Sequence, residues 1–198
     1  MNKAILLSGG IDSIALAYWK RPALAITVDY GQLAAAGEHR AATQVSRKLG
    51  LQHEVISVDC RSLGSGDLAG TRPSELAPAS EWWPFRNQLL LTLAAMRCVT
   101  LGVDELMIGS VKTDGFHADG RLEFVRLLSQ VTESQEGSLR LSAPAIDLTS
   151  VELVRTSAVP MSLLAWAHSC HTASFACGRC RGCEKYLQVM TEILNGVA

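Results

Sequence analysis

The sequence predicts an α/β fold in which a parallel, five-stranded sheet is covered by helices on both faces. Short apolar runs alternate along the chain with helical patterns, which is the layout of a parallel sheet with crossover helices. A glycine-rich turn directly follows the first apolar run, where such folds bind phosphate. With 198 residues and 48% apolar content, the chain is long enough to bury a full core.

Five segments have the strand pattern, and the stretches between them carry the helical period. We expect strands over residues 3–7, 24–29, 53–58, 105–108 and 140–143, and helices near 13–20, 38–49, 87–101 and 121–130. Right-handed crossovers then make a Rossmann-like sheet with the first strand at its centre. A further helix should begin after Thr149, because Glu152 completes a capping box. Residues 60–84, rich in glycine, serine and proline, are expected to form a long surface loop of the kind that often acts as a lid.

The turn after the first strand has the composition of a phosphate-binding loop. It comprises Leu7, Ser8, Gly9, Gly10, Ile11, Asp12 and Ser13. Adjacent glycines let backbone N–H groups approach phosphate oxygens, the serine hydroxyls add donors, and a helix starting near Asp12 would direct its positive end there. No lysine follows as in a Walker A loop. The pattern resembles instead the PP-loop of N-type ATP pyrophosphatases, which implies ATP binding and substrate adenylation. A plain glycine-rich turn is the alternative.

Four of the six cysteines crowd into one short window near the end of the chain. They are Cys170, Cys177, Cys180 and Cys183. Their spacing suits a tetrahedral Zn²⁺ site, and four thiolates leave no position for a catalytic water, so the zinc would be structural. An iron–sulfur cluster and a redox-active cysteine pair are the alternatives. Because thiolates already satisfy the metal, His168 and His171 are expected to be solvated or to cap backbone groups.

Composition limits the partners and the compartment. The formal net charge of −1 argues against a nucleic-acid partner and favours a small-molecule substrate. The apolar runs near the N-terminus suit neither a signal peptide nor a spanning helix, so we expect a cytoplasmic protein without a membrane partner. A homodimer is the default oligomer. The domains expected are an ATP-binding α/β domain over residues 1–160 and a zinc-binding helical appendage over residues 161–198.

Taken together, the motifs resemble the 7-cyano-7-deazaguanine synthases of queuosine precursor biosynthesis over nearly the whole chain. The resemblance rests on the PP-loop, on Asp29-Tyr30-Gly31-Gln32, on Pro84-Phe85-Arg86-Asn87 and on the cysteine knuckle. It implies a PP-loop fold and a ligase that uses ATP and ammonia to convert 7-carboxy-7-deazaguanine, through an amide, to the nitrile.

The resemblance also implies roles for matching residues. ATP contacts fall on residues 7–13 with Asp29, Tyr30 and Gln32; substrate contacts on Arg86, Asn87, Asp114, Asp119 and Arg121; catalytic roles on Ser8, Asp12, Ser13 and Lys112. Asp12 would hold Mg²⁺ on the phosphates. The family's lysine after the last strand, at the start of the helix that follows Thr149, aligns near Ser150 here. Lys112 could compensate for its loss if it turns into the site. Asp114 and Asp119 could instead cap the helix near residue 121.

Three other functions remain open at this point. A related ligase would attach the activated deazaguanine to an amine of a protein or another partner. Sulfur transfer to tRNA uses similar loops with catalytic cysteines, but Cys60 and Cys98 lack a reactive context and the net charge disfavours RNA. A nucleotide-binding module would bind ATP without releasing pyrophosphate.

Overall fold

A computed structural model of the chain describes residues 2–195. Its sheet is built from β1 (Lys3–Leu6), β2 (Leu24–Asp29), β3 (Gln52–Ser57), β4 (Glu105–Met107) and β5 (Arg140–Ser142). All neighbouring strands are parallel, in the order β3-β2-β1-β4-β5. The predicted class and the central position of β1 are therefore confirmed, and each predicted strand end lies within about one residue of the observed one.

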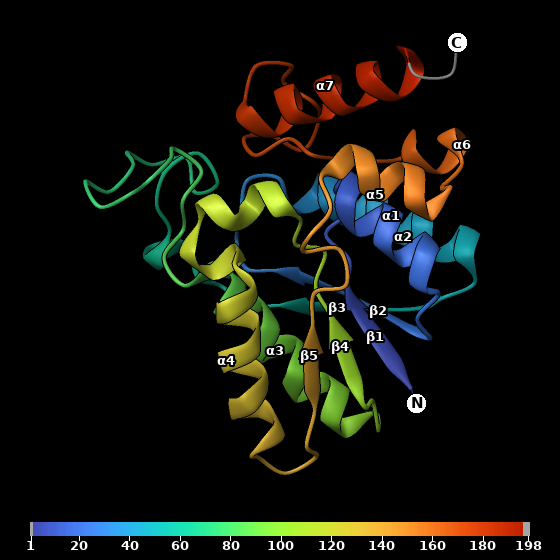
Figure 1. Cartoon of the computed structure of the whole chain (residues 1–198). Helices are drawn as coiled ribbons and strands as arrows, with labels where there is room; N and C mark the ends of the chain where they lie inside the picture. Colours follow the sequence, from blue (N-terminus) through green and yellow to red (C-terminus); the bar gives the residue numbers. More distant parts are fainter. Residues whose placement is uncertain (1, 196–198) are drawn as a thin grey trace.

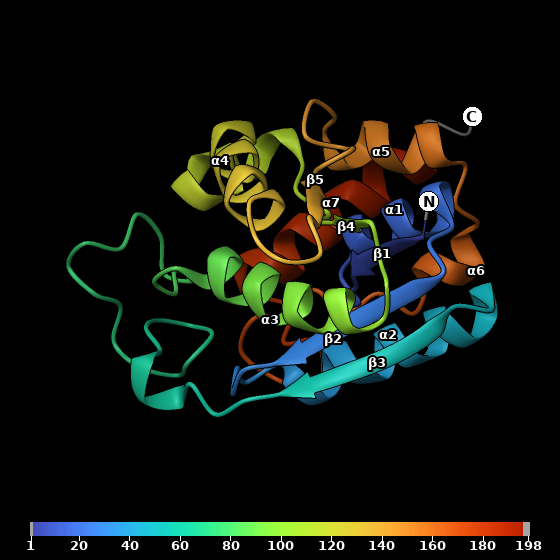
Figure 2. The ribbon, with the colours of Figure 1, turned by 90° about the horizontal axis from the view of Figure 1, so that it is seen from below.

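Helices cover both faces of this sheet, as predicted (Figures 1 and 2). They are α1 (Ile11–Lys20), α2 (Ala35–Leu49), α3 (Arg86–Thr100), α4 (Leu122–Glu133), α5 (Ser150–Ser157), α6 (Met161–Leu164) and α7 (Arg181–Asn195), with short 3-10 turns η1 (Arg61–Leu63), η2 (Lys112–Phe116) and η3 (Ala118–Gly120). The predicted capping box is present: the Thr149 hydroxyl accepts the Glu152 N–H at 3.2 Å, and the Glu152 carboxylate accepts the Thr149 N–H at 2.8 Å.

Alternate residues of β1 belong to different core clusters. Ala4 and Leu6 pack with the apolar residues of α3 and α4, whereas Ile5, and Leu7 directly after the strand, pack with those of α1, α2 and α5. This follows from the two-residue period of a strand, which points successive side chains to opposite faces. Because both faces are covered, the central strand is apolar throughout its buried part, as is typical of parallel sheets.

The C-terminal helix α7 packs against the α/β part of the protein. In Figure 1, α7 lies across α5, above the carboxyl end of the sheet. Val189 and Ile193 of α7 join the cluster that contains Leu153 of α5 and the side chains of α1. The C-terminal helix thus shares a core with the α/β part. Among the helices of residues 2–195, none combines the length and apolarity needed to cross a membrane.

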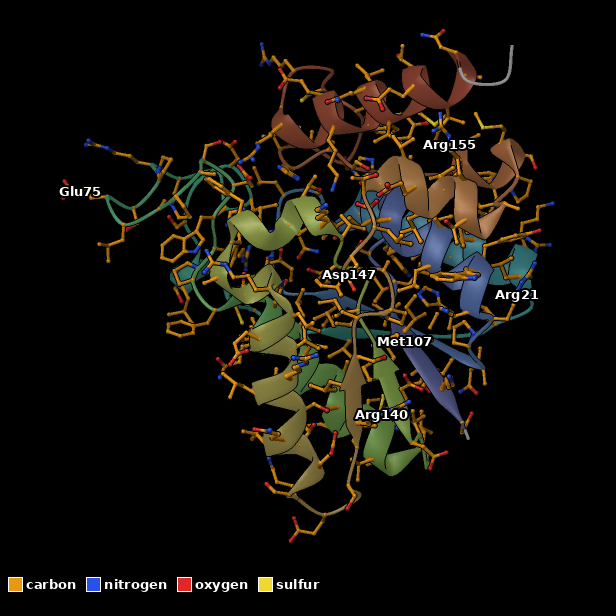
Figure 3. All side chains as sticks on the ribbon, viewed as in Figure 1. Arg21, Glu75, Met107, Arg140, Asp147 and Arg155 are labelled. Atoms are coloured by element: carbon orange, nitrogen blue, oxygen red, sulfur yellow. The ribbon has the colours of Figure 1, made fainter. Side chains whose placement is uncertain are left out.

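The segment between β3 and α3 is long and largely irregular, as predicted, and it projects beyond the sheet (Figure 2). Glu75 lies at its tip, far from Met107 and Arg140 in the sheet (Figure 3). Leu68 and Trp83 anchor the segment, because both side chains are buried in the core cluster beneath α3.

Candidate active site

A cavity of about 700 Å³ lies where the strand order reverses between β1 and β4. Its walls include the turn after β1, Tyr30 after β2, and Gly109 and Ser110 after β4, while α7 and the preceding segment close it from the other side. Ligands of open parallel sheets bind at this reversal point, beyond the carboxyl ends of the strands.

The turn after β1 forms a compact set of hydrogen-bond donors at the cavity wall. Ser8 Oγ lies 3.2 Å from Ser13 Oγ and accepts the Gly10 N–H at 3.3 Å, and Ser13 Oγ donates to the Gly10 carbonyl at 2.9 Å. α1 begins at Ile11, so the N–H groups of its first turn lack intrahelical partners and carry the positive end of the helix dipole. This arrangement can bind an anion.

Each glycine of the turn has its own steric reason. Gly9 has a φ of +78°, and a Cβ there would lie 2.7 Å from both the Ala41 Cβ and the Glu38 carbonyl oxygen. Gly10 has an ordinary φ of −74°, and a Cβ there would meet only Ser8 Oγ at 3.5 Å and Ser169 Oγ at 3.9 Å. Gly9 therefore permits the packing of the turn on α2, while Gly10 keeps the cavity side of the turn open.

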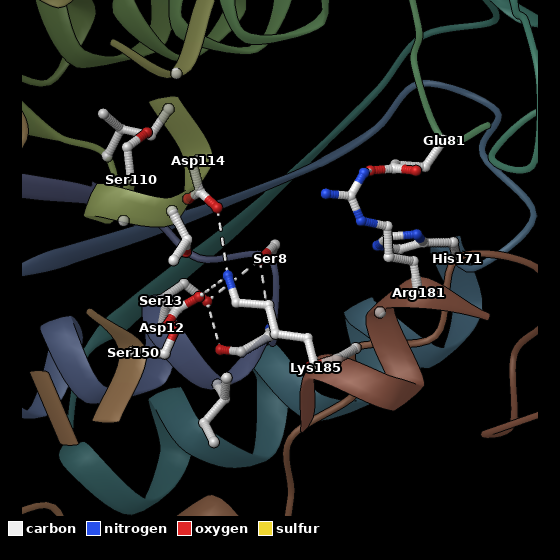
Figure 4. Close-up of a pocket in the computed structure, with 18 of the residues that line it drawn as sticks. Ser8, Asp12, Ser13, Glu81, Ser110, Asp114, Ser150, His171, Arg181 and Lys185 are labelled. Carbon is white, nitrogen blue, oxygen red and sulfur yellow. Dashed lines mark hydrogen bonds and ion pairs between the residues drawn. The ribbon is translucent and has the colours of Figure 1, made fainter. Parts of the chain in front are cut away.

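A lysine from α7 lies over the turn (Figure 4). Lys185 Nζ is 2.9 Å from Asp12 Oδ2 and 3.3 Å from Asp114 Oδ1. Burial alone would lower the pKa of Lys185, but the two carboxylates outweigh it and raise the pKa, so the ammonium persists. Burial raises the pKa of Asp12 despite this ion pair. Asp12 Oδ1 is buried and has no hydrogen-bond partner among residues 2–195, and Ser150 lies beside Asp12 (Figure 4).

The turn after β2 positions a carboxylate that sequence reasoning did not identify. Gln32 accepts the Tyr30 N–H at 2.9 Å through Oε1 and donates to Glu38 Oε2 at 2.7 Å through Nε2. Asp29 accepts the Gly31 N–H at 3.0 Å. Burial raises the pKa of Glu38 to about 7 and also raises that of Tyr30. Tyr30 of this turn and Glu38 of α2 line the cavity. Asp29 and Gln32 do not line it but hydrogen-bond to the turn, and Gln32 also bonds to Glu38.

The predicted substrate residues divide between cavity and support. Arg86 and Asn87, at the start of α3, line the cavity. Asp119 accepts the Asn87 backbone N–H at 3.1 Å, and its carbonyl accepts the Asn87 side-chain N–H at 2.9 Å, so Asp119 caps α3 rather than the helix that follows it. Arg121 Nε donates to the Gly115 carbonyl at 2.9 Å, away from the cavity.

The structure therefore brings most of the predicted residues to one cavity. Those that line it are Leu7, Ser8, Gly10, Ile11, Asp12, Ser13, Tyr30, Arg86, Asn87 and Asp114; those that do not are Gly9, Asp29, Gln32, Lys112, Asp119 and Arg121. Lys112 is exposed on η2, and the cation above the turn after β1 is Lys185 instead. Their roles in binding and catalysis stay predictions.

The four predicted metal ligands converge. Their sulfur atoms all lie within 4.8 Å of one another, with the Cys170–Cys180 and Cys177–Cys183 pairs at 3.9 Å. Zinc–sulfur bonds of about 2.3 Å in a tetrahedron require sulfurs about 3.8 Å apart. The His171 N–H also donates to Cys180 Sγ at 3.3 Å, which favours a thiolate. The cluster is compatible with zinc.

A second polar cluster faces the turn after β1 across the cavity (Figure 4). Glu81, from the end of the long loop, pairs with Arg181 Nη1 at 2.8 Å and with His117 Nε2 at 3.4 Å through the same oxygen, Oε1. Burial would raise the pKa of Glu81, but a backbone hydrogen bond and Arg181 outweigh it and lower the pKa. His171 also lines the cavity rather than lying in solvent, and burial lowers its pKa.

Sequence reasoning missed Lys185, Glu38 and Glu81 as candidate site residues. Lys185 follows the last cysteine so closely that its charge suggests only a partner for zinc-bound thiolates. Glu38 begins a helical pattern and resembles an ordinary first-turn acid. Glu81 lies in an irregular segment without periodicity. One feature of the sequence could have pointed to Glu81. It directly precedes two tryptophans, and such a pair can anchor a loop and so fix the position of its neighbours.

Nearly the whole chain matches a known protein family. The model of the queuosine biosynthesis protein QueC family matches residues 3–193. The 7-cyano-7-deazaguanine synthase of Desulforudis audaxviator is 31% identical, over 93% of this chain and 94% of that protein. Proteins of the same name from Methanosarcina barkeri (28% identity, 93% and 91%) and Porphyromonas gingivalis (30% identity, 92% and 89%) are similar over comparable lengths. The matched residues include both the turn after β1 and the cysteine cluster.

Proposed function

The chain belongs to the queuosine biosynthesis protein QueC family, and we propose on that premise that it is an ATP-dependent 7-cyano-7-deazaguanine synthase. Its substrate would be the carboxylate of 7-carboxy-7-deazaguanine, which it adenylates and converts with ammonia to the amide and then to the nitrile. The observation that carries the proposal is the turn after β1, residues 7–13, which we call the phosphate turn. It lies at the reversal point of the sheet, and its two serines and Gly10 line a cavity of about 700 Å³.

The chemistry divides into two activations of the same carbon. A carboxylate oxygen attacks the α-phosphorus of ATP, the α–β anhydride bond breaks, and pyrophosphate leaves. Ammonia attacks the activated carbonyl carbon, loses a proton and displaces AMP, which gives the amide. The amide oxygen then attacks a second ATP, again releasing pyrophosphate, and departure of AMP with loss of both remaining N–H protons gives the nitrile.

The residues of the turn would bind and orient the phosphates. Backbone N–H groups at the start of α1 and the hydroxyls of Ser8 and Ser13 would hold the departing pyrophosphate, whose negative charge grows as the anhydride bond breaks. Lys185 would supply the cation that Lys112 is too exposed to provide, because its ammonium already lies at the turn. Such positioning and charge stabilisation need no covalent intermediate on the protein.

The side chains present could bind two metal ions, Mg²⁺ through carboxylates and Zn²⁺ through thiolates. Asp12 Oδ1 is a buried carboxylate oxygen without a hydrogen-bond partner in the described part of the chain, and Lys185 contacts both Asp12 and Asp114. These two carboxylates would hold Mg²⁺, which would neutralise phosphate charge. Cys170, Cys177, Cys180 and Cys183 would hold Zn²⁺ in a closed, structural site. This zinc would fix the segment that leads into α7 and therefore the position of Lys185.

An enzymatic assay with purified components tests whether the protein has this activity. Purified protein is incubated with ATP, Mg²⁺, ammonia and 7-carboxy-7-deazaguanine, and AMP and the mass of the base are measured. We expect AMP and the nitrile from the wild type and far less AMP from Ser8→Ala. AMP at the Ser8→Ala level in the wild type would contradict the synthase. AMP formed only when a protein amine replaces ammonia would instead favour the related ligase that modifies a protein.

A further inference from the structure

The cluster of Glu81, His117 and Arg181 brings together three separate parts of the chain at the cavity. Glu81 ends the long loop, His117 follows η2, and Arg181 begins α7. Arg181 Nη1 and His117 Nε2 both contact Oε1 of Glu81. The other oxygen, Oε2, is buried and has no hydrogen-bond partner within the described residues. The side chain of Glu81 is only 8% exposed, although it lines the cavity.

An unpartnered buried carboxylate oxygen needs an explanation. Leaving a buried charged acceptor unsatisfied is costly, whereas a bound donor would recover that cost. Oε1 already has its donors, which fix the orientation of the carboxylate and leave Oε2 as the oxygen available to a ligand. A carboxylate held in this way is preorganised to accept a hydrogen bond and discriminates strongly against ligands that lack a donor there.

We propose that Oε2 of Glu81 binds the N–H edge of the base, formed by the ring N1–H and the exocyclic 2-amino group of the deazaguanine substrate. The inference rests on the proposed function and adds the residue that selects the base. Glu81 lines the same cavity as the phosphate turn, and beside it lie Arg86 and Asn87 at the start of α3. A cavity of about 700 Å³ is within the range of sites that enclose a ligand larger than a single base.

Contacts with two other parts of the chain hold the end of the long loop, and therefore Glu81, in place. Trp83 is buried and packs edge-on against Tyr30 with ring centroids 4.8 Å apart, so the end of the long loop is anchored to the turn after β2. Arg181 ties the same loop to the start of α7 through Glu81. The carboxylate therefore stands on a rigid support, which hydrogen-bond recognition of one edge of a base requires.

Binding measurements test this without turnover. Dissociation constants of 7-carboxy-7-deazaguanine and of its analogue without the 2-amino group are measured by calorimetry for wild type, Glu81→Gln and Glu81→Asp. Glu75→Gln, at the exposed tip of the same loop, is the matched control. We expect the wild type and Glu75→Gln to prefer the 2-amino base by about 10- to 100-fold, the value of one hydrogen bond to a charged group. Glu81→Gln should bind the 2-amino base more weakly and lose most of this preference.

The outcomes separate this inference from the function itself. An unchanged preference in folded Glu81→Gln and Glu81→Asp, or equal weakening of both bases, would overturn the role of Glu81, since a merely structural residue affects both ligands alike. A change in the KM for ammonia without a change in base preference would also overturn it, by assigning Oε2 to the amine. Absence of AMP in the wild type would contradict the proposed function alone, because the binding preference is measured independently. Melting temperature and ATP affinity identify a variant that fails to fold.

Discussion

Gly10→Ala should weaken ATP binding strongly while lowering the stability of the fold only slightly. The backbone of Gly10 has φ −74° and ψ 160°, a conformation that any residue adopts. A Cβ there would lie 3.5 Å from Ser8 Oγ and 3.9 Å from Ser169 Oγ, both ordinary contacts. Both of these serines line the cavity, so the added methyl would stand where a phosphate has to approach the turn.

The size of the effect follows from the hydrogen bonds that the methyl displaces. A hydrogen bond to a charged group contributes about 1.5–3 kcal/mol. Loss of one such bond between the turn and a phosphate raises the Kd for ATP by about 10- to 150-fold. Alanine is a poorer N-cap than glycine by up to about 1 kcal/mol. For a chain of this length, that lowers the Tm by no more than about 4 °C.

Calorimetric titration with ATP and thermal unfolding measure the two effects. Gly50→Ala is the control, because Gly50 has a φ of +69°, lies at the far end of α2, and leaves open space of at least 4 Å around the position that a Cβ would take. It should lose stability and keep its affinity for ATP, the opposite pattern. Unchanged ATP affinity in a folded Gly10→Ala variant would refute the assignment of the turn to phosphate binding.

Four further changes test the site and its support. Gly9→Ala should cost about 2–5 kcal/mol of unfolding free energy, from left-handed strain and overpacking, against about 1–2 kcal/mol for Gly50→Ala; equal losses would contradict the close packing. Cys180→Ser should reduce bound zinc and lower the Tm, and unchanged metal content by elemental analysis would exclude the knuckle. Lys185→Gln should weaken ATP binding by about tenfold or more, the value of one charged hydrogen bond; affinity equal to wild type would rule out its phosphate role. Because the pKa of Glu38 rises from 4.5 to about 7 on folding, the native state binds more protons, so stability should fall as the pH rises from about 4.5 to 7, by at most about 3 kcal/mol. Glu38→Gln should flatten that part of the pH–stability curve, and an identical curve would show that another group is responsible.

The sequence was sufficient for the sheet and for the local turns. β2 occupies the residues predicted for it, because a largely apolar run that is interrupted only by Thr27 and ends at Asp29 marks a strand buried on both faces. The capping box at Thr149 was equally predictable, since it depends on residues only three apart. The first three residues of α2 were missed, because their alanine-rich sequence carries no apolar stripe to mark the helix start.

The candidate site was predictable only where function depends on local sequence. The phosphate turn is one contiguous segment, and the cysteines lie within one short window. Lys185, by contrast, reaches Asp12 from 173 residues away along the chain, and Glu81 meets Arg181 across 100 residues. Such pairs depend on how α7 and the long loop fold back over the sheet. Lys112 is near the predicted site in sequence, but η2 directs it to solvent.

Oxygen transfer tests the central claim, which is that the substrate carboxylate attacks the α-phosphorus of ATP bound at the turn. The protein is given ATP, Mg²⁺, ammonia and 7-carboxy-7-deazaguanine labelled with ¹⁸O in the carboxylate, and the products are separated and analysed by mass spectrometry. Adenylation predicts ¹⁸O in the phosphate of AMP and none in pyrophosphate. Label in inorganic phosphate together with ADP would show that the γ-phosphorus is attacked instead and would contradict the account.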